Sequence, residues 1–339
     1  MTPLVQRKWL PLLLTATILV GLLLAACGGG AEDSLTIYSG RSETLVGPLI
    51  QQFQEDTGVD VSVKYAGTPQ LAATLLEEGT NTPADLFFAQ DPGGLSAVEG
   101  MLRALPPSTL SLVPEWASSP SGRWIGLSGR ARTVVYNTDR LAPEDLPDDL
   151  TGFADPKWKG RIGWAPTNAS FQTMVTAMRA VWGEEQTLQW LSDVQANEPK
   201  VYPANTPTVA ATAAGEIDVG FVNHYYLYRF LAEEGESFKA RNYHPRAGGP
   251  DAIIMVAGAG ILSESDNPGN AQKFIDYLLS DSAQQYFAAE TYEYPLTGRI
   301  PASGGVIPLS EINNPDLSSQ DLSDLAGSQK LIRQAGLIP

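Results

Sequence analysis

Apolar strands alternate with amphipathic helices at the start of the body of this 339-residue chain, and this alternation limits the folds it can adopt. The helix predicted over 43–57 places Leu45, Leu49 and Phe53 on one face, and Gly58 ends it. Thr68 is expected to cap a second helix. The order is therefore β-α-β-α-β, which predicts a mainly parallel sheet with helices on both faces. The predicted strands are 35–40, 59–65 and 84–89.

A second α/β unit is predicted in the middle of the chain. A strand at 133–137 precedes it, and the unit begins near Arg161 with a helix at 171–182 and a strand at 219–222. Another apolar segment, 253–259, follows late in the chain. Strands that return from distant parts of the sequence predict two lobes, separated by a cleft that can close on a ligand by hinge motion.

We expect each lobe to be built from two separate stretches of chain. The N-terminal lobe would comprise residues 35–130 and about 256–305, and the C-terminal lobe residues 131–255 and about 306–339. In an open α/β sheet, a ligand binds beyond the carboxyl ends of the strands. The loops after the first three strands are therefore the first candidates for the cleft wall. These loops are 39–43, 66–70 and 90–94.

The N-terminus has the pattern of an export signal. A short positively charged region precedes an apolar run at 10–24, and small residues lead to Cys27. This pattern resembles the bacterial lipoprotein processing site, which predicts a signal peptide over 1–26, lipidation of Cys27 and a flexible tether over 27–34. A plain transmembrane anchor is the alternative, but the run is shorter than the ~20 apolar residues of a span. We expect an exported protein, lipid-anchored at the outer face of the cytoplasmic membrane or in the periplasm.

Composition disfavours several classes of function. The chain has 38 acidic residues against 22 basic ones, a net charge of −16, which disfavours nucleic acid and anionic lipid surfaces as partners. Cys27 is the only cysteine, so neither an internal disulfide nor a cysteine-based metal site can form. There are only two histidines, and there is no Gly-x-Ser-x-Gly elbow, His-Glu-x-x-His motif or P-loop. We therefore expect a binding protein and not an enzyme.

Several segments, in the same order along nearly the whole body of the chain, match a known family. They are 35–41, 127–130, 164–167, 202–205 and 222–226. Together they resemble the bacterial ferric iron-binding proteins, which are the substrate-binding lipoproteins of iron ABC transporters and have the type II periplasmic binding fold. The resemblance implies a two-lobed monomer that binds Fe³⁺ together with a synergistic anion (carbonate, phosphate or citrate) and delivers it to the permease subunits of an ABC importer.

A tyrosine pair is the most specific part of this resemblance, which implies that Tyr225 and Tyr226 are iron ligands. Fe³⁺ is a small, hard trication that favours anionic oxygen, and a bound cation of high charge can displace the proton of a phenol, whose ordinary pKa is about 10. Two adjacent tyrosines in a loop after the strand at 219–222 can converge on one ion, whereas in a strand they would point to opposite faces. Without the family pattern, the pair would be interpreted as two aromatic side chains packed on a lobe surface.

The N-terminal lobe offers fewer metal ligands than the family pattern implies. Ser42 and Gln90 stand where many members have a histidine and a glutamate, and we expect both to line the cleft. Glu43 is a candidate carboxylate ligand; alternatively, it is an acidic residue in the first turn of a helix, where the helix dipole favours negative charge. His224, beside the tyrosines, is expected to cap or orient a neighbour.

Because the N-terminal lobe offers few metal ligands, a bound anion would have to supply more of the oxygen atoms around the iron. Asn168, Ala169 and Ser170 precede a predicted helix, whose free N–H groups and dipole suit an anion. Asn168 or Ser170 could equally be an ordinary N-cap, and the two roles are compatible. Asn205 and Asn223 match the anion-site pattern of the family.

Arginines supply the positive charge that such an anion needs. Arg41 and Arg130 lie on segments expected to face the cleft, and either could neutralise the anion through a bidentate contact. Arg132 is the alternate to Arg130, because it lies two residues along a strand and therefore on the same face.

A close alternative on the same fold is a receptor for a small organic anion, such as a phosphonate or a sugar phosphate. Ser42 and Gln90, which replace usual iron ligands, favour this alternative, whereas Tyr225 and Tyr226 argue against it. A metal requirement for high-affinity binding would separate the two functions.

Overall fold

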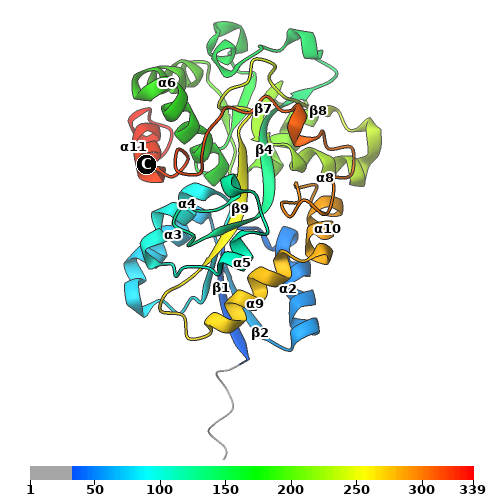
Figure 1. The fold of residues 1–339 in the computed structure, drawn as a ribbon. Helices are drawn as coiled ribbons and strands as arrows, with labels where there is room; N and C mark the ends of the chain where they lie inside the picture. Colours follow the sequence, from blue (N-terminus) through cyan, green and yellow to red (C-terminus); the bar gives the residue numbers. More distant parts are fainter. Residues whose placement is uncertain (1–32) are drawn as a thin grey trace, which may run out of the picture.

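The computed structural model describes residues 33–339. The predicted signal peptide, 1–26, and the predicted lipidated residue, Cys27, lie outside the described residues. Helices flank one hydrogen-bonded sheet (Figure 1), so the α/β class predicted from the sequence is confirmed.

The chain alternates between strands and helices along most of its described length. The strands are β1 (Ser34–Ser39), β2 (Asp60–Tyr65), β3 (Leu86–Ala89), β4 (Ile125–Asn137), β5 (Ile162–Trp164), β6 (Lys200–Val201), β7 (Val219–Asn223), β8 (Ala240–Tyr243) and β9 (Ile254–Ile261). The α-helices are α2 (Glu43–Thr57), α3 (Thr68–Glu78), α4 (Pro92–Ala97), α5 (Pro107–Leu110), α6 (Ala169–Ala196), α7 (Asn205–Ala213), α8 (Tyr225–Glu234), α9 (Pro268–Leu278), α10 (Asp281–Ala289) and α11 (Leu325–Gln334). Among the described helices, none combines the length and the apolar character needed to cross a membrane.

The sheet has parallel pairs toward its edges and antiparallel pairs at its centre. Its order is β2-β1-β3-β9-β4-β7-β5-β6, and β8 pairs with β4 beside this path. β1 lies parallel to β2 and β3, and β5 lies parallel to β6 and β7. β4 and β9 run antiparallel to their neighbours. The predicted parallel arrangement thus describes the two outer parts of the sheet, and antiparallel strands connect them.

β4 changes partners midway and so connects the two outer parts of the sheet. It pairs with β9 up to Ala131 and with β7 from Arg132 onward, and Figure 1 shows β4 and β9 side by side at the centre of the molecule. All 13 residues of β4 are buried. The sequence predicted only 133–137 as a strand, because the buried first part contains Arg130 and other polar residues and does not alternate. The predicted lobe boundary at 130/131 lies one residue from this change of partner, but the extents of the lobes stay predictions.

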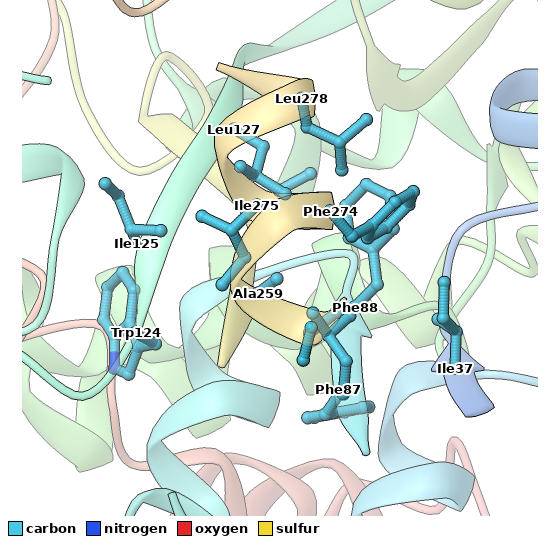
Figure 2. Close-up of a cluster of buried hydrophobic side chains, with 14 of the residues drawn as sticks. Ile37, Phe87, Phe88, Trp124, Ile125, Leu127, Ala259, Phe274, Ile275 and Leu278 are labelled. Atoms are coloured by element: carbon cyan, nitrogen blue, oxygen red, sulfur yellow. The ribbon is translucent and has the colours of Figure 1, made fainter. Parts of the chain in front are cut away.

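A first hydrophobic core lies between α9 and the part of the sheet that contains β1, β3 and β9. Phe274 and Leu278 of α9 belong to the same buried cluster as Phe87 and Phe88 of β3 (Figure 2). Phe53 of α2 meets the Phe274 ring edge-on, with ring centroids 5.1 Å apart. The predicted amphipathic helix is confirmed, because α2 covers 43–57 and ends at Gly58 with a φ of 74°.

A second core lies beneath α6 and α11. Trp164 of β5 meets Phe171 of α6 edge-on, with centroids 5.6 Å apart, and α11 adds Leu331 and Ile332. Each outer part of the sheet therefore buries its apolar side chains in a core of its own, as expected for two lobes.

α6 is longer than predicted and is interrupted. The sequence predicted a helix over 171–182, whereas α6 extends to Ala196 across Gly183, whose φ of 82° is not helical. Glycine adopts such a positive φ without steric cost, so two helical segments continue across one residue.

The prediction that Thr68 caps a helix is wrong. Gly67 occupies the cap position of α3, and the Thr68 hydroxyl instead accepts a hydrogen bond of 2.9 Å from the backbone N–H of Gln90. The loop after β3 needs this acceptor because the backbone there is buried, and an unpaired buried N–H is costly.

Phe274→Ala should lower the free energy of unfolding by about 3–5 kcal/mol, because it removes a buried ring from the first core and leaves a cavity. Urea unfolding followed by circular dichroism measures the change. The control is Leu76→Ala on α3, where the side chain is 57% exposed and the change should be below about 0.5 kcal/mol. Equal effects of the two substitutions would contradict the placement of α9 over the core.

Candidate functional site

A cleft of about 360 Å³ opens beyond the carboxyl ends of the parallel strands. Each of the three loops predicted from the sequence contributes to its wall, and segments that follow β5, β6 and β7 contribute as well. Leu45, Tyr65 and Ala204 were not predicted to line the cleft. The lining residues are Gly40, Arg41, Ser42, Glu43, Leu45, Tyr65, Ala66, Gln90, Asn168, Ala204 and Tyr226. The cleft therefore lies where open α/β sheets bind their ligands.

Tyr225 and Tyr226 begin helix α8, directly after β7 and His224. Their rings stack with centroids 4.2 Å apart and planes 30° apart. Tyr225 is fully buried, and Tyr226 lies in the cleft wall. The prediction that the pair lies in a loop was wrong, because both residues are helical; the two rings are brought together by stacking.

Burial raises the pKa of Tyr226 above its usual range, and the neighbouring Tyr225 adds to this rise. The phenol of Tyr226 therefore holds its proton more firmly than a tyrosine in water does. Only a cation of high charge density at the cleft would make its deprotonation favourable.

Arg41 connects the loop after β1 to the tyrosine pair. Its Nη1 atom lies 3.5 Å from the Tyr225 hydroxyl, and its Nη2 atom donates to Glu293 Oε2 at 2.6 Å. Burial by itself lowers the pKa of Arg41, but Glu293 and the two tyrosines outweigh it and raise this pKa above its ordinary value. Arg41 is therefore a permanently charged group in the cleft wall.

Glu293 is a site residue that the sequence analysis missed. It follows α10, its side chain is fully buried, and its Oε2 atom also accepts from the Thr291 hydroxyl at 3.0 Å. One signal could have indicated it: its carboxylate stands between two large aromatic residues, Tyr292 and Tyr294. A carboxylate buried in such surroundings requires a cationic partner.

The first turn of α6 forms the opposite wall. The Asn168 side chain accepts the backbone N–H of Ser170 at 3.0 Å, so the N-cap interpretation is confirmed. Asn205, at the start of α7, donates to the same Asn168 oxygen at 3.4 Å. Ala169 is buried in this turn. The structure thus brings Asn168, Ala169, Ser170 and Asn205 together, as the resemblance to the family implied.

Ser170 joins three further predicted residues. Its hydroxyl oxygen accepts from Asn223 Nδ2 at 3.0 Å, Gln90 Nε2 at 3.1 Å and Arg130 Nη1 at 3.3 Å. Gln90 lies in the cleft wall, but Arg130 and Asn223 are fully buried behind it. Arg132 is buried as well and donates to Asn223 Oδ1 at 3.1 Å.

Two arginines on β4, Arg130 and Arg132, bring positive charge into the buried region behind the cleft wall. Burial, together with the neighbouring charge of Arg130, lowers the pKa of Arg132 to about 9. Burial also lowers the pKa of Arg130, with a contribution from Arg41. The guanidinium groups therefore repel one another in a dry environment, where negative charge would be favoured.

The N-terminal side of the cleft has only modest ligands. Glu43 is the first residue of α2 and lies in the cleft wall. Ser42, just before it, contacts the Thr44 hydroxyl at 3.2 Å and makes no side-chain cap hydrogen bond. The places of Ser42 and Glu43 agree with the interpretation that Glu43 is an acidic residue in the first turn of a helix. Its role as a metal ligand stays a prediction.

His224 uses both of its ring nitrogens inside the protein. Nδ1 accepts the backbone N–H of Ala131 at 3.1 Å, so Nε2 carries the proton and donates to the Tyr292 carbonyl at 2.8 Å. The ring also stacks on Tyr294, with centroids 4.7 Å apart. His224 therefore holds the start of α8 against β4.

The cleft wall carries oxygen atoms on Glu43 and Tyr226 and hydrogen-bond donors on Arg41, Gln90 and Asn168. Within residues 33–339, no group of three or more His, Cys, Asp or Glu side chains could hold a metal ion. A metal in the cleft would therefore depend on phenol oxygens, on Glu43 and on oxygen atoms brought by an anion. Arg41 and the first turn of α6 supply the positive charge and N–H groups that suit such an anion.

Comparison with known proteins agrees with this geometry. The family described as bacterial extracellular solute-binding protein matches residues 48–317. The chain belongs to this family. It is 33% identical over 326 residues to the major ferric iron-binding protein of Neisseria meningitidis, a match that covers 93% of this chain and 97% of that protein.

Two solved structures are also similar. Iron-bound HitA from Pseudomonas aeruginosa has a TM-score of 0.86 and 32% identity and covers 90% of this chain and 99% of its own. The Trichodesmium protein IdiA (FutA), in complex with iron and citrate, has a TM-score of 0.75 and 28% identity, with coverage of 90% and 100%. The resemblance to ferric iron-binding proteins is therefore confirmed, and the family is one of solute-binding proteins, not enzymes.

Glu293→Ala should lower the free energy of unfolding by about 3–5 kcal/mol, because it leaves the Arg41 guanidinium buried without its carboxylate. Chemical denaturation measures the loss. Lys239→Ala removes an ion pair of which both side chains are more than half exposed, and it should cost less than about 1 kcal/mol. A similarly small loss in both variants would show that Arg41 finds another partner or water.

Asp251→Asn should change how stability depends on pH. Burial raises the pKa of Asp251 to about 7, and Asp149 adds to the rise. The folded state thus binds this proton more tightly than the unfolded chain, so the stabilising contribution is present below about pH 4 and is lost as pH rises through about 7. Asparagine stays neutral at every pH. The free energy of unfolding of the variant, relative to that of wild type, should therefore be higher at about pH 8 than at about pH 5. An equal stability difference between variant and wild type at the two pH values would contradict the prediction.

Proposed function

We propose that this protein is the extracytoplasmic solute-binding component of an ABC importer, that it binds ferric iron through Tyr225 and Tyr226 with a synergistic anion, and that it delivers the iron to the permease. The observation that carries this proposal is the stacked tyrosine pair at the cleft wall, in a chain similar to proteins named for ferric iron binding.

The tyrosine pair supplies the ligand type that Fe³⁺ favours. Two phenolates offer two anionic oxygens from adjacent residues at the start of α8. Glu43, across the cleft, is proposed as a third oxygen ligand, because its carboxylate lies in the wall formed by the N-terminal side of the sheet. Ser42 and Gln90 are proposed to line the cleft without binding the ion.

The anion is proposed to lie between the first turn of α6 and Arg41. Asn168, Ala169 and Asn205 present polar groups at the starts of two helices, where the dipoles favour negative charge. Arg41 adds a fixed positive charge in the same wall. Carbonate, phosphate and citrate all have the required chemistry, and the Trichodesmium relative holds iron with citrate.

The proposal includes the location and partners of the protein. We place it outside the cytoplasm as a monomer, held at the membrane by a lipid on Cys27, with the permease subunits of an importer as its partners. The family match supports an exported solute-binding protein.

The excess of hydrogen-bond donors around the cleft favours one alternative, a receptor for a phosphonate or a sugar phosphate. Arg41, Asn168 and Gln90 would suit such an anion without any metal. This receptor would bind its ligand equally well in the presence of a chelator.

Titration of the purified, iron-free protein with ferric nitrilotriacetate tests the proposal. We expect a visible tyrosinate-to-iron charge-transfer band that saturates at one equivalent and strengthens when bicarbonate or citrate is added. Tyr225→Phe and Tyr226→Phe should each weaken the band and reduce affinity at least about tenfold, because each removes an anionic ligand.

Tyr228→Phe is the matched control. Tyr228 lies on the same helix, and its hydroxyl donates to the Gly305 carbonyl at 3.2 Å, outside the cleft wall. The band should survive this change. If the folded wild-type protein gave no band, the ferric function would be wrong, and phosphonates and sugar phosphates would be titrated next without metal.

A further inference from the structure

Three side-chain donors meet at the hydroxyl of Ser170. Asn223, Gln90 and Arg130 donate to this one oxygen at 3.0, 3.1 and 3.3 Å. All four side chains are more than nine-tenths buried. They come from four separate elements, so the contact depends on the folded sheet and not on local sequence.

Three donors are more than one neutral hydroxyl can satisfy, because its oxygen has two lone pairs. One donor brings a full positive charge: Arg130 donates to Ser170 and to the Val256 carbonyl, and its Nε atom is buried without a hydrogen-bond partner in the described part of the chain. Such a set of donors matches an anionic oxygen better than a hydroxyl.

Ser170 separates these donors from the cleft. Gln90 and Asn168 lie in the cleft wall, whereas Ser170, Asn223 and Arg130 do not. The Ser170 hydroxyl thus engages the donors of Asn223 and Arg130 just behind the wall, next to Gln90 and Asn168, which line the cleft.

We propose that Ser170 is a specificity-determining residue, because its hydroxyl takes the place of an anion oxygen. It keeps the donors of Arg130 and Asn223 from the bound anion. The site therefore favours a small planar anion such as carbonate over a tetrahedral one such as phosphate. This inference rests on the proposed function, because it concerns the anion of the same site. It also narrows the direct anion contacts to Arg41, Asn168 and the first turn of α6.

The proposal predicts an effect opposite in sign to the loss of an ordinary anion ligand. Ser170→Ala removes the acceptor and leaves Arg130 and Asn223 with donors that lack a partner. Phosphate entering the cleft would restore those hydrogen bonds, so binding of phosphate should become tighter. A serine that bound the anion directly would instead bind it more weakly after the change.

Isothermal titration calorimetry of inorganic phosphate into the iron-free protein tests this effect. We expect Ser170→Ala to bind phosphate about tenfold more tightly than wild type, which corresponds to about 1.4 kcal/mol. Bicarbonate affinity should change less. Ser328→Ala is the matched control, because Ser328 is also a buried serine that accepts from an arginine, Arg179, at 3.2 Å, but lies on α11 away from the cleft. Its phosphate affinity should equal that of wild type.

Unchanged or weaker phosphate binding by folded Ser170→Ala would overturn the proposal. If the alanine variant does not fold, Ser170→Cys decides the question, because the thiol leaves no cavity and is a weaker acceptor than the hydroxyl. It too should bind phosphate more tightly than wild type. The titration uses no iron, so the absence of a ferric band would refute the proposed function without deciding the role of Ser170.

Discussion

The pairing of β4, first with β9 and then with β7, is the constraint on which the rest of the structure depends. β4 is buried along its whole length, so its polar side chains cannot turn to water and must find partners inside the protein. Arg130 and Arg132 therefore reach Ser170 and Asn223, residues of the elements that follow β5 and end β7. One strand thus connects the two parts of the sheet and brings positive charge to the point where the cleft forms.

The charges of the cleft follow from that burial. Among the ion pairs of the described residues, the pair of Arg41 and Glu293 is the one with both side chains fully buried. This ion pair holds the Arg41 guanidinium beside Tyr225. The positive charges of Arg130 and Arg132 on β4 are compensated more weakly. Burial raises the pKa of Tyr226 and so keeps the proton on its phenol. The same wall therefore places a protonated phenol beside a fixed guanidinium, and the dry surroundings strengthen the interactions of both groups with any charge that enters the cleft.

Much of this organisation was predictable from the sequence. The amphipathic helix at 43–57, the loops that follow the first three strands and the N-cap at Asn168 are local features, and local propensity decides them. The grouping of Ser170, Asn205 and Asn223 came from the resemblance to a family, because no spacing along the chain places these residues together. The error at Thr68 was tertiary in origin: a distant backbone N–H, that of Gln90, uses the hydroxyl that a helix cap would have used.

The sequence by itself determined the α/β class, the position of the cleft at the ends of the strands and the residue types at its wall, because strand and helix periodicity and turn residues are encoded within short segments. Only the tertiary structure decided which groups are buried together. Glu293 lies 252 residues from Arg41, and the Ser170 hydroxyl meets donors from three other elements. The strength of these interactions depends on the exclusion of water, and water is excluded only once the two cores and β4 have assembled.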